Sequence, residues 1–463
     1  MKNAITFILL CTTLAGADWD RFRGPDGGGV GETGKLPSLF GEKQNLRWRT
    51  VLPAGHSSPI VSKGRVFLTA VDGDDLLVIC MDAASGKELW RKVAPRDRKS
   101  SVDKRNSPAS PSAAADGQAI YVFFQDAGLI SYDYQGKLLW RTPLGPFQNV
   151  YGMGASPVIA GELVVLVCDQ SSGSFAAGFE RVTGKQRWRV NRKEALSGHA
   201  TPLVHEGLIY APGSFSMEVY QAATGELAWR VGGLASEMKS VPVIWNGHIF
   251  ISGYNTPEND PGRQVKIQDF EEMIAKADKN GDGKISIAES PDERTKKYFP
   301  YIDLNGDGLM DAAEWKMYAA TMAAENGLIS VKLGGHGDVT GTHVAWKFHK
   351  SIPQLPSTLI YRDVLYMIND SGVLSTINPR TGDLYKQARL RGVSESFYSS
   401  PVASDGKVFF LSRPGVLTVV EAGREQKVLS SHELNEEAVA TPAVWGGRLY
   451  LRTNLALYCY GVR

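Results

Sequence analysis

The sequence repeats itself with a period of roughly 40–45 residues, which is the length of one β-propeller blade. Each copy starts with a small residue and usually a proline, continues through short apolar strands separated by glycine turns, and in most copies approaches its end at a further glycine turn such as Thr-Gly. Blades of this kind bury their apolar faces by stacking on one another. The repeat predicts an all-β, eight-bladed β-propeller with copies starting at Ser58-Pro59, Ser110-Pro111, Ser156-Pro157, Thr201-Pro202, Val241-Pro242, Ser357-Thr358, Ser400-Pro401 and Thr441-Pro442.

The ends of the first four copies are the most alike. Glycine supplies the positive φ of a tight hairpin, and the tryptophan that follows covers apolar surface between neighbouring blades. We therefore assign these residues to structure and not to catalysis. The four ends read DAASGKELW (82–90), DYQGKLLW (133–140), ERVTGKQRW (180–188) and QAATGELAW (221–229).

The last copy stops after its third strand, at Cys459-Tyr460-Gly461. Residues 45–50 (NLRWRT), just before the first copy, look like a blade-ending strand without a blade. Joining the two would close the ring and leave no open sheet edge. We therefore expect Trp48 to belong to the eighth blade.

The fifth copy is interrupted between HIFISGYN (248–255) and NGLISVKL (326–333). By comparison with its neighbours, the interruption falls in the hairpin between the second and third strands, where a loop tolerates insertion. The insertion should therefore lie near one mouth of the central channel. The predicted segments are a signal peptide (1–17), an N-terminal extension (18–44), propeller (45–255), an inserted EF-hand pair (256–325) and propeller again (326–463).

Two twelve-residue segments of the insertion, DKNGDGKISIAE (278–289) and DLNGDGLMDAAE (303–314), fit the calcium loop of an EF-hand at every ligand position. A hard cation prefers such a set of oxygens, so two Ca²⁺ ions are predicted. The second loop should bind more tightly because it offers four carboxylates against three. The predicted ligands are Asp278, Asn280, Asp282, the Lys284 carbonyl, Ser286 and Glu289 in the first loop, and Asp303, Asn305, Asp307, the Leu309 carbonyl, Asp311 and Glu314 in the second.

The residues around the loops predict helices. Apolar residues recur at helical spacing from Ile267 to Ala277, and an alanine-rich stretch with Trp315 and Met322 follows the second loop. Ser290 is the expected N-cap of the linking helix, with a proline in its first turn. The last helix is expected to stop at Asn326-Gly327.

The N-terminus predicts export. Lys2, an apolar run over residues 4–14 and the Ala-Gly-Ala step before Asp18 are typical of a cleaved signal peptide, with a lipid anchor at Cys11 as an alternative. The protein would then be periplasmic or secreted. Three cysteines would remain, an odd number in apolar runs, which favours buried free thiols over a disulfide framework.

Charge and hydropathy limit the classes of partner that the chain is expected to bind. The chain has 51 lysine and arginine residues against 49 aspartate and glutamate residues. This balance gives no electrostatic footprint for nucleic acid or an anionic membrane. The apolar N-terminal run is too short to be a transmembrane segment.

Several polar residues precede the inner strands of the blades and should converge on the channel mouth. They could form a pocket for a small molecule or a partner. They could instead serve turns and inter-blade hydrogen bonds, which is the interpretation that the sequence favours, and the pocket stays open as the alternative. The residues are His56, Arg105, Asn106, Tyr151, His199, Lys239 and Tyr398.

The motif WDRFRGPDGGG (19–29), the repeated blade starts and ends, and LYLRTNLALYCYG (449–461) resemble the secreted PQQ-like, BamB-type propeller proteins. The resemblance implies a quinoprotein-like fold and two classes of function. One is a monomeric, non-catalytic binding or scaffold protein of the cell envelope with a protein or peptide partner. The other is a PQQ-dependent dehydrogenase, because related propellers hold that cofactor at the channel mouth. The sequence lacks an adjacent cysteine pair and a recognisable Glu/Asn/Asp metal set, so we expect the first class and no PQQ.

Overall fold

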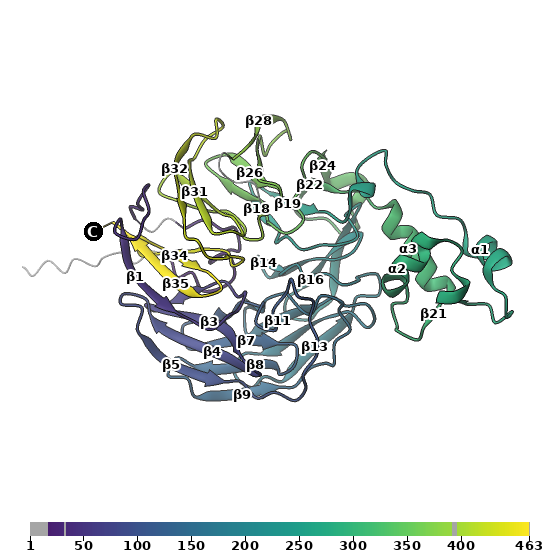
Figure 1. Ribbon diagram of the computed structural model, residues 1–463, viewed down its shortest axis with the longest axis horizontal. Helices are drawn as coiled ribbons and strands as arrows, with labels where there is room; N and C mark the ends of the chain where they lie inside the picture. The colour runs from purple at the N-terminus through teal and green to yellow at the C-terminus, as the bar shows by residue number, and fades with distance from the viewer. Residues whose placement is uncertain (1–16, 32–33, 391–395, 463) are drawn as a thin grey trace, which may run out of the picture.

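The computed structural model describes residues 17–31, 34–390 and 396–462. The described residues form eight antiparallel sheets arranged as the blades of a ring, with a helical insertion projecting from one side (Figure 1). The predicted eight-bladed β-propeller is therefore confirmed. The signal peptide and the alternative anchor at Cys11 lie almost wholly outside the described residues.

The first four blades run in sequence order, each from its inner to its outer strand. Blade one is β2 (Ile60–Ser62), β3 (Arg65–Asp72), β4 (Asp75–Asp82) and β5 (Glu88–Val93); blade two is β6 (Ala114–Ala115), β7 (Ala119–Phe124), β8 (Gly128–Asp133) and β9 (Leu138–Thr142); blade three is β10 (Val158–Ala160), β11 (Leu163–Cys168), β12 (Phe175–Glu180) and β13 (Gln186–Asn191); blade four is β14 (Leu203–His205), β15 (Leu208–Pro212), β16 (Ser216–Gln221) and β17 (Leu227–Gly232).

The last four blades follow the same order, apart from the insertion and the closing strand. Blade five is β18 (Val243–Trp245), β19 (His248–Gly253), β22 (Gly327–Lys332) and β24 (Val344–Phe348); blade six is β25 (Leu359–Tyr361), β26 (Val364–Ile368), β27 (Val373–Ile377) and β28 (Leu384–Arg389); blade seven is β29 (Val402–Ser404), β30 (Lys407–Leu411), β31 (Val416–Glu421) and β32 (Val428–Glu433); blade eight is β33 (Ala443–Trp445), β34 (Arg448–Arg452), β35 (Ala456–Gly461) and β1 (Leu46–Val51).

The ring closes between its two ends, as the sequence predicts. Strand β1 pairs antiparallel with β35, with Trp48 opposite Cys459 and Val51 opposite Ala456. The first strand of the propeller therefore completes the last blade, whose sheet would otherwise expose an unpaired edge at β35. Trp48 is the outer-strand tryptophan of blade eight.

Among the described residues, outer-strand tryptophans of five blades join their blade to the next. Trp48 Nε1 donates a hydrogen bond to the Ala83 carbonyl (3.2 Å) in the turn of blade one. The turn glycine, Gly86, has a φ of 72°, which favours glycine. A Cβ at this position would also lie only 2.5 Å from the Trp48 ring, so a larger residue would clash. The same hydrogen bond recurs from Trp90 to Tyr134, Trp140 to Arg181, Trp188 to Ala222 and Trp346 to Pro379.

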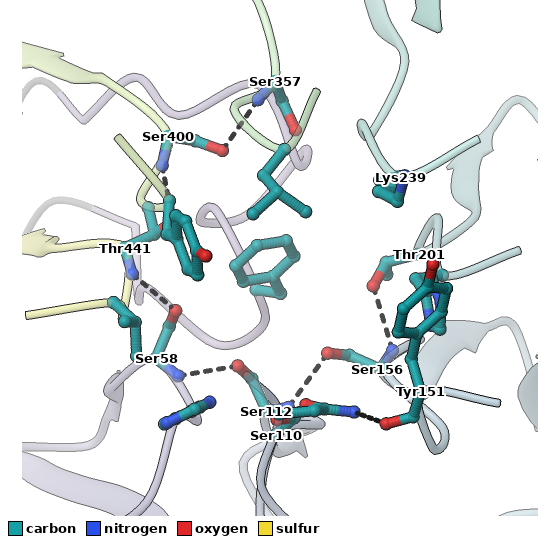
Figure 2. Close-up of a pocket in the computed structure, with 18 of the residues that line it drawn as sticks. Ser58, Ser110, Ser112, Tyr151, Ser156, Thr201, Lys239, Ser357, Ser400 and Thr441 are labelled. Atoms are coloured by element: carbon teal, nitrogen blue, oxygen red, sulfur yellow. Dashed lines mark hydrogen bonds between the residues drawn. The ribbon is translucent and has the colours of Figure 1, made fainter. Parts of the chain in front are cut away.

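A ring of hydroxyl groups surrounds the channel. At seven of the eight blade starts, which the structure describes in full, a backbone N–H donates to the Ser or Thr hydroxyl of the next blade (Figure 2). The series breaks where blade five carries Val241. Among the described residues, these hydrogen bonds run from Ser58 to Ser112, Ser112 to Ser156, Ser156 to Thr201, Val241 to Ser357, Ser357 to Ser400, Ser400 to Thr441 and Thr441 to Ser58.

The predicted start of blade two was wrong by two residues. Ser112, and not Ser110, occupies the ring position, because Ala114 pairs with Tyr121 as Ile60 of blade one pairs with Phe67. Ser110 instead accepts a hydrogen bond from Ser107 N–H (3.2 Å) in the preceding loop. The Ser110-Pro111 step resembles a blade start in sequence, but it lies two residues before the position that strand pairing gives to the start of blade two.

The N-terminal segment crosses the channel below this ring. Trp19 forms a bridge with Val61 of blade one, and Val30 forms a bridge with Ala403 of blade seven. Between them, the fully buried Arg23 donates to the Thr358 carbonyl of blade six (2.6 Å). Residues 19–31 thus contact inner strands around the ring and close the channel at this depth.

The insertion leaves blade five between β19 and β22, in the hairpin that the sequence predicts. It has its own apolar core, which includes Met273, Phe299 and Trp315. The elements are η1 (Pro257–Asn259), α1 (Phe270–Ala277), β20 (Ile285–Ser286), η2 (Ile287–Glu289), α2 (Glu293–Ile302), β21 (Leu309–Met310) and α3 (Ala312–Ala323).

Two of the predicted helix ends were wrong. Asp292, and not Ser290, caps α2, because its side chain accepts the Thr295 N–H (2.7 Å). Helix α3 ends at Ala323, before the expected stop, because Asn326 is recruited into a buried hydrogen-bond cluster at the base of the insertion.

Blade five also departs from the repeat after β22. The short strand β23 (Gly337–Asp338) pairs in parallel with β17, so blade four gains a fifth strand, and α4 (Thr340–His343) follows.

Cys80, Cys168 and Cys459 are free and buried, as expected. Among the described helices, none is both long and apolar enough to cross a membrane.

Candidate functional site

The polar residues singled out at the blade starts meet at one cavity of about 250 Å³ in the channel mouth (Figure 2). Part of the cavity wall is the hydroxyl ring, and Phe22 of the N-terminal segment also lines the cavity. With residues 19–31 crossing the channel below, the cavity is a pocket that opens towards the insertion. The sequence-derived residues that line it are His56, Arg105, Asn106, Tyr151, His199, Lys239 and Tyr398.

These side chains also bind one another and their neighbours. Arg105 pairs with Asp103 (2.7 Å) and lies 5.0 Å from the centre of the Tyr151 ring. The Tyr151 ring in turn meets the His199 ring edge to face at 5.8 Å. Lys239 pairs with Glu237. The two interpretations that the sequence left open are therefore compatible, because contacts between blades hold the groups that line the pocket.

The pocket is lined by two cations, each paired with a carboxylate, and by neutral imidazoles. Burial lowers the pKa of His56 to about 4, and burial next to Lys239 lowers the pKa of His199 to about 3. Both imidazoles are therefore neutral at pH 7, whereas Arg105 and Lys239 are cations. Among the described residues that line the pocket, none is Asp or Glu.

The two loops of the insertion have the shape of EF-hand calcium loops. In each, the first aspartate accepts the N–H of the sixth-position glycine: Asp278 from Gly283 (3.0 Å) and Asp303 from Gly308 (2.8 Å). Both glycines have positive φ. The loops pair through the short strands β20 and β21, with Ile285 opposite Met310.

The last predicted ligand of each loop is almost buried. Hydrogen bonds from the Ser286 hydroxyl and from backbone N–H groups lower the pKa of the Glu289 carboxyl to about 2. Burial raises the pKa of Glu314, although it accepts the N–H groups of Leu304 (2.9 Å) and Asp311 (3.1 Å). The two loops therefore differ in the surroundings of their twelfth residue.

In the described residues, no three His, Cys, Asp or Glu side chains converge in a way that could hold a metal ion. The loop carboxylates accept backbone N–H groups, as Asp278 and Glu289 do. The fit to calcium rests on the donor chemistry and the loop shape: carboxylate, amide, hydroxyl and carbonyl oxygens follow the twelve-residue order, with glycine at the sharp turn. These residues suit a hard cation with several oxygen ligands.

Two asparagines tie the insertion to blade five, and the sequence analysis missed this role. Asn259 Nδ2 donates to the carbonyls of Thr321 (2.7 Å) and Ala324 (2.8 Å) at the end of α3. Asn326 Nδ2 donates to the Thr256 carbonyl (2.7 Å), and its N–H donates to the Asn259 carbonyl. Both residues are fully buried. An asparagine in a polar segment gives no sequence signal for such a clamp.

The roles of Phe22 and Arg23 also do not follow from the sequence, although both lie in the motif 19–29. Burial lowers the pKa of Arg23 to about 9, and its guanidinium donates to backbone carbonyls, including that of Gly27 (3.0 Å). The high content of Gly, Arg and aromatic residues in 19–29 suggests a special backbone path. It does not show that this path crosses the channel.

Taken together, a closed eight-bladed ring, a pocket in its channel mouth and an inserted pair of EF-hand-like loops define a quinoprotein-like propeller with a helical insertion. The family model described as outer membrane protein assembly factor BamB matches residues 30–177, 175–269 and 320–462. Since these matches cover well over half of the chain, the protein belongs to this family. An EF-hand model matches residues 270–289.

Relatives of both functional classes are found by sequence. The chain is 27% identical over 214 residues to the outer membrane protein assembly factor BamB of Moranella endobia, covering 42% of this chain and 52% of that one. It is 30% identical over 164 residues to the quinohemoprotein alcohol dehydrogenase ADH IIB of Pseudomonas putida, covering 34% and 22%. The aligned region thus spans about half, or less, of these relatives.

Solved structures share the fold. BamB from Moraxella catarrhalis superposes with a TM-score of 0.55 at 11% identity, covering 92% of this chain and 99% of that one. The quinohemoprotein alcohol dehydrogenase from Comamonas testosteroni superposes with a TM-score of 0.59 at 11% identity, covering 96% and 81%. At this identity the likeness concerns the fold alone.

Proposed function

We propose that this protein is a calcium-binding, non-catalytic binding protein of the cell envelope. Its insertion binds two Ca²⁺ ions, and its propeller presents the channel mouth to a protein or peptide partner. Export by the signal peptide 1–17 and a monomeric state are parts of the same proposal, as is the insertion boundary 256–325. The names of the BamB relatives support an envelope role.

One observation carries the calcium proposal: two complete twelve-residue loops pair back to back through β20 and β21. Paired loops of this kind are the usual unit of EF-hand binding, and each offers at least five protein oxygens in the order that Ca²⁺ prefers. The first loop lies within the part of the chain that an EF-hand model matches. Glu289 and Glu314 would each supply the bidentate carboxylate at position twelve.

The pocket supports a binding role. It combines two cations, two neutral imidazoles, two tyrosines and a ring of hydroxyls around one cavity of about 250 Å³. Such a mixture of polar groups can orient a polar ligand or a side chain of a partner. The partner interaction would use this mouth and the insertion next to it.

A PQQ-dependent dehydrogenase is the second candidate, favoured by the similarity to quinohemoprotein alcohol dehydrogenases. The cysteines of the mature chain, Cys80, Cys168 and Cys459, are far apart in sequence and buried in separate blades. The described pocket lining has no carboxylate that could hold a metal beside a quinone. Reconstitution with PQQ and Ca²⁺ should therefore give no dye-linked alcohol oxidation above a blank, and clear turnover would favour the enzyme.

Calorimetric titration with Ca²⁺ tests the first proposal. The parent protein should bind two ions, and Glu289→Gln and Glu314→Gln should each lose one, because a neutral amide cannot replace the bidentate carboxylate. The second site should be the tighter one. A stoichiometry of zero or one in the parent would contradict the proposal, and Glu293→Gln, in the exposed first turn of α2, is the matched control.

A further inference from the structure

The insertion lies next to the propeller, and residues of both line a common cleft. A cleft of about 290 Å³ separates the channel mouth from helices α2 and α3. On the propeller side its walls include Tyr151, Leu196 and Glu237, and on the insertion side they include Tyr301 and Tyr318. Because Tyr151 lines both this cleft and the channel pocket, the two cavities adjoin.

The second loop lies at this junction. Glu314 lines the cleft, and it also lines a cavity of about 500 Å³ between the loop and blade three with the segment that follows it, together with Asn305 and Asp311. On the opposite wall of that cavity are Arg189 and Lys193. Three of the predicted ligands of the second loop therefore face the propeller.

The first loop is placed differently. None of the described residues of 278–289 lines the channel pocket, the cleft or the cavity next to the second loop. Helix α1, which leads into it, lies at the end of the insertion farthest from the ring (Figure 1). The two loops are thus alike in sequence but unlike in position.

Helix α3 connects the second loop to the base of the insertion. It begins at that loop, where Asp311 caps it and accepts the N–H groups of Ala313 and Glu314. It ends at the asparagine clamp, where Asn259 binds the Thr321 carbonyl. A rise of 1.5 Å per residue makes α3 about 18 Å long. A change in the geometry of Glu314 therefore acts on one end of a helix whose other end is fixed to blade five.

Tyr301 connects the same loop to the mouth. It lies in the last turn of α2, two residues before Asp303. Tyr301 and Tyr151 line the same cleft, and Tyr151 also lines the channel pocket, so Tyr301 lies next to the pocket wall.

We propose that Ca²⁺ in the second loop, and not in the first, sets the shape and accessibility of the channel mouth. Binding draws the ligand oxygens, Glu314 among them, towards the ion, and α3 and Tyr301 transmit the change to the cleft walls. Coupling between two sites is reciprocal, so a partner bound at the mouth would tighten or weaken calcium binding by the same factor. The inference rests on the proposed calcium sites and adds the regulation of the pocket.

Hydrogen exchange of the full mature protein, read by mass spectrometry, tests the coupling. Segments 148–154, 195–200 and 236–240 report on the mouth, and segment 88–93, the outer strand of blade one, which lines none of the three cavities, is the internal control. Saturating Ca²⁺ should slow exchange of the mouth segments at least about 5-fold relative to chelator, the lower end of typical couplings between sites. The control segment should not respond.

Three variants separate the loops. Glu289→Gln should keep the mouth response at saturating Ca²⁺, and Glu314→Gln should lose it. Tyr301→Ala changes a half-exposed residue that is not a ligand, so it should keep two calcium sites by calorimetry and lose at least half of the response.

Two results would overturn the coupling: a full response in Glu314→Gln, or none in a parent protein that calorimetry shows to hold two ions. Absence of calcium binding in the parent would instead contradict the proposed function, and the coupling with it.

Discussion

The propeller and the insertion are stabilised in different ways. The propeller repeats the same contacts between blades, including the tryptophan hydrogen bonds and the hydroxyl ring, and β1 closes it. The insertion has one small core, with Met273, Ile285 and Met310 among its buried residues, and two loops rich in carboxylates. A ring of similar units distributes its stability, whereas a small module with acidic loops depends on whatever neutralises them. The two regions should therefore respond differently to mutation, pH and metal.

The largest effect is expected from Trp48→Ala, which weakens ring closure. The half-buried indole packs on Gly86 and donates to the Ala83 carbonyl. Its loss should cost about 3 kcal/mol of propeller stability. Thermal or denaturant unfolding measures this cost. Leu89→Ala, at an exposed site on β5, should change stability by less than about 0.5 kcal/mol. Equal effects of the two variants would refute the closing role of Trp48.

The clamp at the base of the insertion should come next. Asn326→Ala removes the acceptor of the Asn255 N–H (2.8 Å) and the donor to the Thr256 carbonyl. Leaving such buried groups without partners should cost about 2 kcal/mol. We expect the cost to appear as faster hydrogen exchange in 256–325. Lys276→Ala, at an exposed site on α1, is the control, and a parent-like exchange pattern in Asn326→Ala would show that the clamp is dispensable.

Acid should weaken the propeller through its pocket histidines. The pKa of His199 is lowered in the folded state to about 3, so its stabilising effect is complete above the unfolded value near 6.5 and is lost as the pH falls towards 3. Because the His199 imidazole borders an open cavity, solvent weakens the effect. We expect the propeller to lose about 1–2 kcal/mol of stability between pH 6 and 4. Unfolding of the parent and of His199→Gln across this range should show a shallower pH dependence in the variant. Identical slopes would contradict the assignment.

The smallest effect tests the break in the hydroxyl ring. Val241→Thr places a hydroxyl opposite the Thr201 N–H and should add about 0.5–1 kcal/mol. Ser357→Ala removes the acceptor of the Val241 N–H (2.8 Å) and should lower stability by about 1 kcal/mol. Denaturant midpoints would show both signs. A destabilising Val241→Thr would mean that blade five cannot adopt the ring geometry.

Features that repeat, or that follow a fixed motif, could be predicted from the sequence. The blade count, the closing strand around Trp48 and the position of the insertion follow from spacing, and the shape of the two loops follows from a twelve-residue pattern. The mouth residues could be gathered because each precedes an inner strand, and His56, His199, Lys239 and Tyr398 all stand two residues before the start of a blade.

Features made by distant segments could not be predicted. Phe22 reaches the pocket because residues 19–31 cross the channel, and Asn259 meets α3 only after the insertion folds back. The start of blade two was wrongly predicted at Ser110 because a local Ser-Pro step carries no information about the pairing register. The pairing of β6 with β7 sets that register. Such contacts depend on the closed ring and not on any local pattern.

The most direct test of the contrast between the two regions is hydrogen exchange of the mature protein with Ca²⁺ and with chelator. The account predicts that chelation increases exchange throughout 265–325, because the loop carboxylates then repel one another. The strands of all eight blades should remain as protected as with Ca²⁺. Loss of protection in the blade strands, or no change in 265–325, would contradict it.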